Sequence, residues 1–108
     1  MNFNLHEMPR AKADKRSILI WLVERSPQGA RAWLKAYDDA LTRLAQSADS
    51  FGQAFENDAC PHSKVKQAFF KTRRGRVYRI VYFIDENDAY VLRVRGPGQA
   101  PVNPDDLR

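Results

Sequence analysis

Positively charged side chains are concentrated in the second half of the chain. Residues 1–63 are neutral overall, so residues 64–108 carry the whole net charge of +5. Such a concentration repels itself unless an anionic partner or solvent compensates for it. Phosphate groups of a nucleic acid, or carboxylates of an acidic protein segment, are suitable partners. The first seven of these cations, with no acid among them, are Lys64, Lys66, Lys71, Arg73, Arg74, Arg76 and Arg79.

Arg79 and two further arginines lie in segments with the composition of β-strands. Residues 77–84 and 89–95 are rich in β-branched and aromatic residues, and a polar turn at 85–88 separates them. Because side chains alternate along a strand, Arg79 should share one face of the sheet with Arg93 and Arg95. The opposite face should pack against helices, and its expected members are Tyr78, Ile80, Tyr82, Ile84, Tyr90, Leu92 and Val94.

Arginines set among aromatic side chains on an exposed sheet can pair with phosphates and stack on bases. The alternative is a solvated basic face that only limits aggregation at the sheet edge. Charge and pattern alone leave both interpretations open.

Few other residues have the chemistry of an active site. His62 could act as a general base if its loop folds over the basic face, and a solvated histidine is the alternative. Cys60 and His62 are too few for a zinc site, which normally needs four ligands. We predict neither a metal nor another cofactor, since a phosphate-cradling glycine motif is also missing. A single cysteine and the lack of an apolar run near 20 residues predict a cytoplasmic protein without a membrane partner.

The elements that would position these residues follow from periodicity. Residues 3–5 form a plausible strand, Pro9 can open a helix, and Ser26-Pro27 can cap a second one. Apolar residues from Ala30 to Leu44 keep one helical stripe, and Trp21 and Trp33 are expected in the core. Residues 46–63 should be loop with one helical turn near 53–56, and a strand is expected at 65–72 before a turn at 73–76.

This order predicts an α+β fold, β-α-α-β-β-β, with an N-terminal helical hairpin on one face of a mostly antiparallel sheet. We expect one domain over residues 1–108, with an irregular tail from about residue 96, where Gly and Pro end the last strand.

Several segments together resemble the RelE/ParE toxin superfamily over residues 1–96. They are Pro9-Arg10-Ala11, the stretch from Trp21 to Pro27, the second helix with Ala30, Trp33, Leu41 and Leu44, the Val77–Tyr82 strand and the Val91–Arg95 strand. The resemblance implies a toxin that a cognate antitoxin neutralises. Many members of this superfamily cleave mRNA on the ribosome, whereas ParE-like members poison DNA gyrase.

In the RNA-cleaving branch, the strand arginine that matches Arg79 contacts the scissile phosphate, and basic residues on neighbouring strands hold the RNA. This chain departs from that branch because residues 96–108 contain neither His nor Tyr. Cleavage needs a proton acceptor, a proton donor and charge stabilisation, and arginine with its pKa above 12 supplies mainly the last. The sequence therefore supports phosphate binding more firmly than cleavage.

The leading hypothesis is a ribosome-dependent mRNA endonuclease with an acidic antitoxin as partner in a hetero-oligomer. A gyrase inhibitor and a non-toxic partner-binding homologue are the alternatives. Arg79 and His62 are the predicted catalytic residues. The predicted phosphate-binding residues are Lys64, Lys66, Lys71, Arg73, Arg74, Arg76, Arg93 and Arg95.

Overall fold

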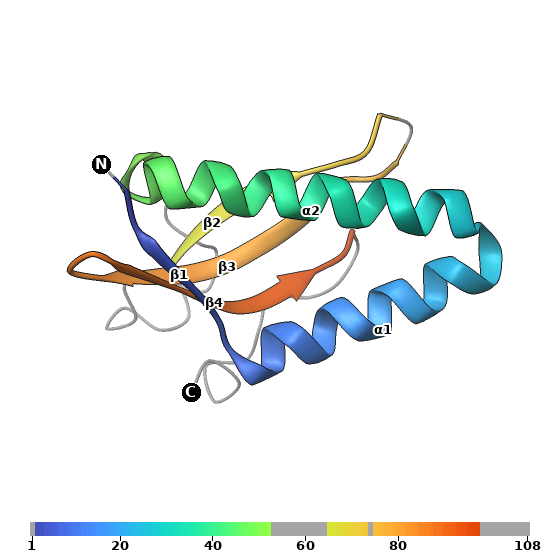
Figure 1. Ribbon diagram of the computed structural model, residues 1–108, viewed down its shortest axis with the longest axis horizontal. Coiled ribbons are helices and arrows are strands. Elements are labelled where there is room, and N and C mark those ends of the chain that lie inside the picture. The colour runs from blue at the N-terminus through green and yellow to red at the C-terminus, as the bar shows by residue number, and fades with distance from the viewer. Residues whose placement is uncertain (1, 53–64, 74, 98–108) are drawn as a thin grey trace.

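The computed structural model describes residues 2–52, 65–73 and 75–97 as two helices packed on a four-stranded sheet (Figure 1). The strand order is β1-β4-β3-β2, with β1 parallel to β4 and the other pairs antiparallel. The predicted α+β fold and order of elements are confirmed. The elements are β1 (Asn4–Glu7), α1 (Pro9–Arg25), α2 (Pro27–Ser47), the 3-10 turn η1 (Ala48–Ser50), β2 (Val65–Phe70), β3 (Tyr78–Asp85) and β4 (Asp88–Arg95).

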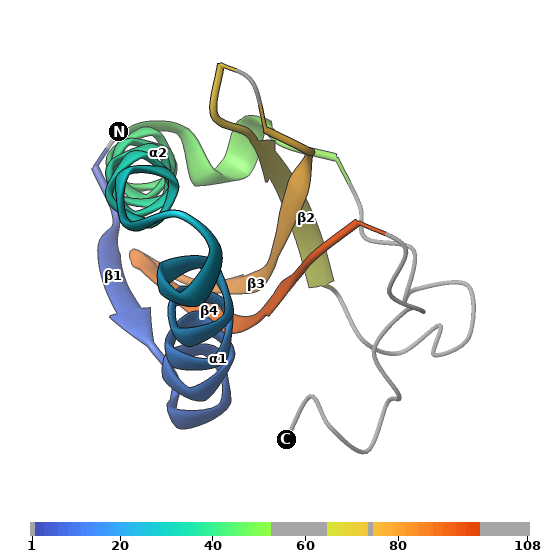
Figure 2. The same ribbon diagram turned by 90° about the vertical axis from the view of Figure 1, so that its right-hand side faces the viewer.

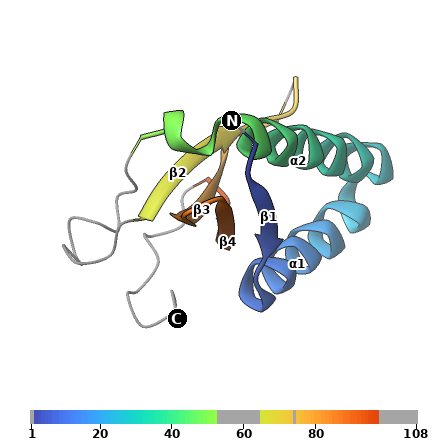
Figure 3. The same cartoon turned by 60° about the vertical axis from the view of Figure 1, so that its left-hand side comes forward.

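The helical hairpin forms where its sequence signals predict. Pro9 is the first residue of α1 and Pro27 the first residue of α2, where a missing N–H leaves no hydrogen bond unmade. The Ser26 hydroxyl accepts a hydrogen bond from the Gly29 N–H at 3.0 Å and so caps α2. Both helices lie on the same side of the sheet (Figures 2 and 3). We call the opposite side of the sheet the outer face.

The core lies between α2 and the sheet. The predicted stripe of α2 is confirmed for its buried members and gains Ala40, whereas Leu34 and Leu41 pack against the core only in part. The buried residues of α2 are Ala30, Trp33, Tyr37, Ala40 and Leu44. Trp33 and Tyr37 contact the Phe70 ring, with ring centroids 5.6 and 5.7 Å apart. Burying an aromatic or aliphatic side chain of this size contributes about 1.5–3 kcal/mol, so this contact is a major source of stability.

A β-bulge changes the two faces of β4. Val81 pairs with Arg93 but Tyr82 pairs with Val91, so Leu92 is an extra residue without an opposite partner. Val91 and Val94 therefore both face the helices, whereas Leu92 packs with Val65 and Val81 on the outer face. The prediction that Tyr90, Leu92 and Val94 share the helix-facing side is wrong, because alternation holds only where the pairing is regular.

The prediction that Trp21 belongs to the core is also wrong, since 52% of its surface is exposed. Asp14 and Trp21 are seven residues apart and share one side of α1. Asp14 reaches β4 at Arg93 and Val94. Trp21 lies two turns further along α1 and lines the same cavity as Gly96 and Pro97, which follow the last residue of β4. The helix thus continues past the end of the strand that would cover this ring.

Smaller differences concern the ends of elements. β1 starts one residue later than expected and continues to Glu7, and β2 ends at Phe70 instead of residue 72. The turn expected near residues 53–56 and the tail from residue 98 lie outside the described residues. Among the described helices, none has the length and apolar character that crossing a bilayer would need.

Candidate functional site

The predicted phosphate-binding residues do not form one patch. Those that the structure describes lie on the outer face, at the edge of β4, beside η1 and on the connection between β2 and β3. His62, Lys64 and Arg74 lie outside the described residues, so their predicted roles stay predictions.

Arg79 and Arg95 lie directly opposite each other on the outer face, as the alternation predicted. Arg79 is 7% exposed, and its guanidinium donates a hydrogen bond of 3.4 Å to Gln67 Oε1 on β2. The expectation of an exposed Arg79 is therefore wrong: the central position of β3 surrounds this side chain with both neighbouring strands. Phe69 is its opposite residue on β2. The two arginines concentrate positive charge at this point of the sheet, but the Arg79 side chain is buried within the outer face.

Arg93 has a different environment. Its Nε and one terminal nitrogen bind the two carboxylate oxygens of Asp14 on α1, at 2.7 and 2.9 Å. The same carboxylate accepts the Val94 N–H at 2.9 Å. Asp14 thereby takes the place of a neighbouring strand at the edge of β4, because β1 ends at Glu7, opposite Val91. A bidentate arginine–carboxylate pair is strong and directional, so Arg93 connects α1 to the sheet.

Lys66 is also engaged within the protein. Its ammonium donates to the carbonyl oxygens of Phe51 at 2.9 Å and Asp49 at 3.5 Å, next to η1. Lys71, Arg73 and Arg76 are exposed on the β2–β3 connection. Of the described basic residues named from the sequence, these three are the most open to a partner.

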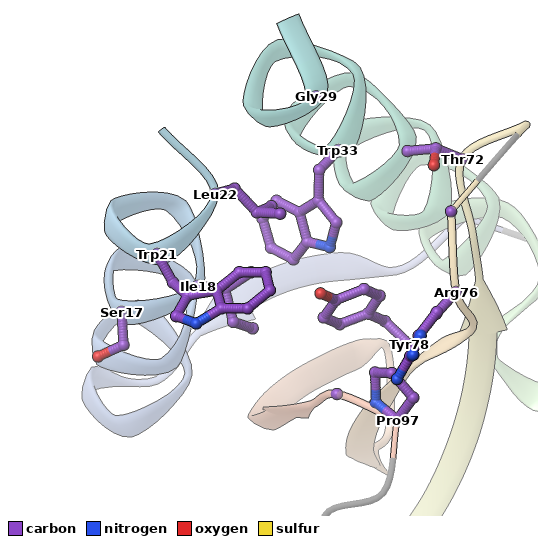
Figure 4. Close-up of a pocket in the computed structure, with 12 residues that line it drawn as sticks. Ser17, Ile18, Trp21, Leu22, Gly29, Trp33, Thr72, Arg76, Tyr78 and Pro97 are labelled. Atoms are coloured by element: carbon purple, nitrogen blue, oxygen red, sulfur yellow. The ribbon is translucent and has the colours of Figure 1, made fainter. Parts of the chain in front are cut away.

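One cavity in the described part of the chain has a lining that does not include Arg79. It has a volume of about 820 Å³ and lies between α1, the first turns of α2 and the β2–β3 connection (Figure 4). Because both tryptophans of the chain line it, we call it the Trp21–Trp33 pocket. Its other lining residues are Ser17, Ile18, Leu22, Gly29, Thr72, Gly75, Arg76, Tyr78, Gly96 and Pro97.

Two polar groups of this pocket are notable. The Trp33 side chain is 2% exposed, and its indole N–H finds no acceptor among the described residues. Figure 4 shows the indole nitrogen turned toward the side of the pocket where Tyr78 and Thr72 lie. Burial raises the pKa of the Tyr78 hydroxyl, and the charge of Arg76 opposes this rise.

The outer face also carries an aromatic row that sequence reasoning missed. Tyr90 stacks between His6 and Phe83, with both centroid distances at 4.8 Å. The His6 ring nitrogen lies 2.9 Å from the Asp88 carboxylate. The bulge at Leu92 is the reason that Tyr90 lies here, and a regular strand pattern gives no sign of it. Cross-strand aromatic contacts of this kind stabilise strand pairing.

The described residues contain no group of three or more His, Cys, Asp or Glu side chains that could hold a metal ion.

The comparisons with known proteins agree on one family. The model of the ParE toxin of type II toxin–antitoxin systems, parDE, matches residues 8–101. Among solved structures, a chain of the chromosomal ParDE toxin–antitoxin system from P. aeruginosa is similar with a TM-score of 0.65 and 17% identity, over 87% of this chain and 95% of that one. A chain of the RelBE2 toxin–antitoxin complex from Mycobacterium tuberculosis is similar with a TM-score of 0.50 and 19% identity, over 89% and 99% of the two chains. No curated protein matches.

The two structural likenesses confirm the fold, and the family model covers most of the sequence, including both helices and the three-stranded meander. The chain therefore belongs to the ParE toxin family and is the toxin component of a type II toxin–antitoxin system.

Proposed function

We propose that this toxin acts by binding a protein target, DNA gyrase, and does not cleave RNA. The observation that carries this proposal is the burial of Arg79, whose guanidinium is bound to Gln67 within the outer face. Membership of the ParE family supports the same choice, because the resemblance noted from the sequence links ParE-like members with gyrase.

Proton transfer is the weak point of the nuclease hypothesis. Cleavage by the RNA's own 2′-hydroxyl needs a proton acceptor within hydrogen-bonding reach of the reacting group. The described side chains next to Arg79 are Gln67, Phe69 and Arg95, and none of them accepts a proton at neutral pH. Phe83 lies four residues along β3 from Arg79, or about 13 Å. His6 is farther away, because it lies in the same row on β1, beyond Tyr90 of β4.

A ribosome-dependent RNase is the second candidate, and one observation favours it. Arg79 and Arg95 are directly opposite each other, so two guanidinium groups lie side by side on the outer face. A phosphate group is an anion that such a pair can bind. His62 would then have to supply the proton acceptor, as predicted from the sequence.

The two candidates are separated by two assays on one purified preparation. We expect the toxin to inhibit supercoiling of relaxed plasmid by gyrase at toxin concentrations that leave mRNA on programmed ribosomes intact. Arg95→Ala should leave gyrase inhibition within twofold of the unchanged protein, and Lys71→Ala is the matched control for loss of one cation.

Codon-phased mRNA cleavage with gyrase unaffected would overturn the proposal. Loss of that cleavage in Arg95→Ala, with Lys71→Ala still active, would then establish the RNase.

A further inference from the structure

We propose that the side of α1 that points away from the core pairs with α1 of a second copy of this chain. The two helices run in opposite directions, so that Arg16 of each copy lies beside Glu24 of the other. This inference concerns the association of the toxin with itself and does not depend on its target. It can therefore fail separately from the proposal on gyrase.

Ile20 lies at the centre of this side of α1. Nine residues, or two and a half helical turns, separate it from Ala11, so the two side chains point in opposite directions. Ala11 is completely buried, whereas Ile20 is 56% exposed and its neighbour Val23 is 52% exposed. α1 lies at the margin of the described fold, so this apolar side can be reached by a partner (Figure 1).

A groove follows the same side of the helix. It shares no lining residue with the Trp21–Trp33 pocket, so the two are separate surfaces of α1. The residues that line the groove all belong to α1 and are Lys12, Lys15, Arg16, Leu19, Ile20, Val23 and Glu24.

The charges along this groove are arranged in a definite order. Arg16, Ile20 and Glu24 follow one another at intervals of four residues and form one ridge about 12 Å long, which we call the α1 ridge. Its ends carry opposite charges and its centre is apolar. Neither Arg16 nor Glu24 has an ion-pair partner among the described residues, whereas Lys15 is paired with Glu7. A ridge of this kind is complementary to a reversed copy of itself.

A two-fold axis next to Ile20 produces that arrangement. In a two-fold dimer each subunit contributes the same surface patch. Ridges of residues four apart interlock in the commonest class of helix packing, which would bring the two Ile20 side chains together. Arg16 of each copy would then lie beside Glu24 of the other, and Lys12, one turn before Arg16, would lie near the same carboxylate. Two intermolecular ion pairs would flank one apolar contact.

A partner with charges of one sign fits the α1 ridge less well. An acidic protein segment or a nucleic acid would be attracted to Arg16 but repelled by Glu24. The net charge of +5 opposes self-association in general, but residues 1–63, which include α1, are neutral overall. The order of charges on the ridge therefore favours a second copy.

The contact is small, so the dimer should be weak. Only Leu19, Ile20 and Val23 supply apolar surface in the groove, and interfaces below about 1,200 Å² are typical of transient association. Sedimentation velocity of the purified toxin between about 1 and 500 µM should show a reversible change from monomer to dimer, with a Kd of roughly 10–100 µM.

Charge reversal tests the pairing directly. Arg16→Glu and Glu24→Arg should each raise the Kd of the dimer at least tenfold, because each places like charges opposite each other. An equimolar mixture of these two variants should dimerise again, with a Kd within threefold of the unchanged protein, because one ridge is then acidic at both ends and the other basic. Ile20→Glu should also raise the Kd at least tenfold.

Arg31→Glu is the matched control. Arg31 is exposed on α2, lines neither cavity, and its substitution changes the net charge by the same amount as Arg16→Glu. It should change the Kd less than threefold. Circular dichroism checks that each variant keeps the fold, as expected for substitutions of exposed residues.

A toxin that stays monomeric over the whole concentration range, or a dimer whose Kd is unchanged by Ile20→Glu, would overturn the proposal. So would a mixture of Arg16→Glu and Glu24→Arg that stays monomeric. If a monomeric toxin loses gyrase inhibition through Ile20→Glu, this side of α1 belongs to the target. If it loses antitoxin binding instead, this side belongs to the antitoxin. Both outcomes exclude a second copy as the occupant.

Discussion

The two helices are attached to the sheet by different interactions. α2 buries a continuous apolar stripe, including Trp33, Tyr37 and Leu44. α1 buries only Ala11 completely, and Ile18, Leu19 and Leu22 pack against the core only in part. Polar contacts to the sheet add to this attachment. These are the pair of Asp14 with Arg93 at 2.7 and 2.9 Å and the contact of Lys15 with Glu7 at 3.2 Å. Ile20, Trp21 and Val23 remain exposed on α1, each by more than half.

This difference shows that two helices of one hairpin can be attached to a sheet by different kinds of contact. α2 buries its apolar stripe against the sheet, so little apolar surface of this stripe remains exposed to a partner. The partly polar attachment of α1 leaves Ile20, Trp21 and Val23 exposed.

The largest expected effect comes from the attachment of α2. Trp33→Ala would leave a cavity among Tyr37, Phe70 and Tyr78, whose rings all contact Trp33. Substitutions of this kind cost about 3–5 kcal/mol, a large part of the stability of a small domain. Urea denaturation followed by circular dichroism measures the loss, and a loss below about 1 kcal/mol would contradict the role given to α2.

The attachment of α1 should contribute less. Asp14→Ala removes the carboxylate that binds both Arg93 and the Val94 N–H, and both donors lie in a mostly buried position. We expect a loss of roughly 2–3 kcal/mol, because the uncompensated arginine adds to the lost hydrogen bonds.

Asp14→Asn is the control, since its amide oxygen can still accept the Val94 N–H. Its free energy of unfolding should lie between those of the unchanged protein and Asp14→Ala. Hydrogen exchange should show α1 opening in Asp14→Ala while α2 stays protected. Equal opening of both helices would show that the hairpin behaves as one unit.

Alkaline pH should weaken the hydrogen bond between Tyr37 of α2 and Glu7, the residue that also binds Lys15 of α1. The Tyr37 hydroxyl of α2 donates to Glu7 at 2.9 Å, beside Lys15 of α1. Burial, with the nearby Glu7 carboxylate, raises the pKa of Tyr37 well above its ordinary value, and burial raises the pKa of Tyr82. The folded state therefore holds these protons more tightly than the unfolded state, and stability present below about pH 10 is lost as the pH rises above it.

The slope of that loss is at most about 1.4 kcal/mol per pH unit for each tyrosine. Tyr37→Phe should lower stability at neutral pH by about 1 kcal/mol and remove one tyrosine from the slope. Denaturation midpoints between pH 8 and 11 test this, and an unchanged slope in Tyr37→Phe would count against it.

The smallest effect should come from the exposed side of α1. Trp21→Ala is expected to change the free energy of unfolding by less than about 1 kcal/mol, because half of the side chain already contacts solvent. The measurement is the same urea denaturation as for Trp33→Ala. A loss comparable to that of Trp33→Ala would mean that the two helices do not differ as described.

Local sequence patterns were sufficient for the elements and for the family. Ser26 and Pro27 define the hairpin, the apolar stripe from Ala30 to Leu44 defines the buried side of α2, and alternation along β3 correctly separates Ile80 and Tyr82 from Val81 and Phe83. These features depend on neighbours within a few residues, so propensity and periodicity report them directly.

The candidate site depended on contacts between distant residues. Asp14 and Arg93 are 79 residues apart in the sequence. The bulge at Leu92 places Tyr90 on the outer face, and no glycine or proline in this strand indicates a bulge. The burial of Arg79 follows from its central strand, and the exposure of Trp21 follows from where β4 ends relative to α1. The sequence thus determined which elements form and which family they belong to. Only the tertiary structure decided which cations are engaged and which apolar residues remain exposed, because register and neighbours are set when distant segments pack together.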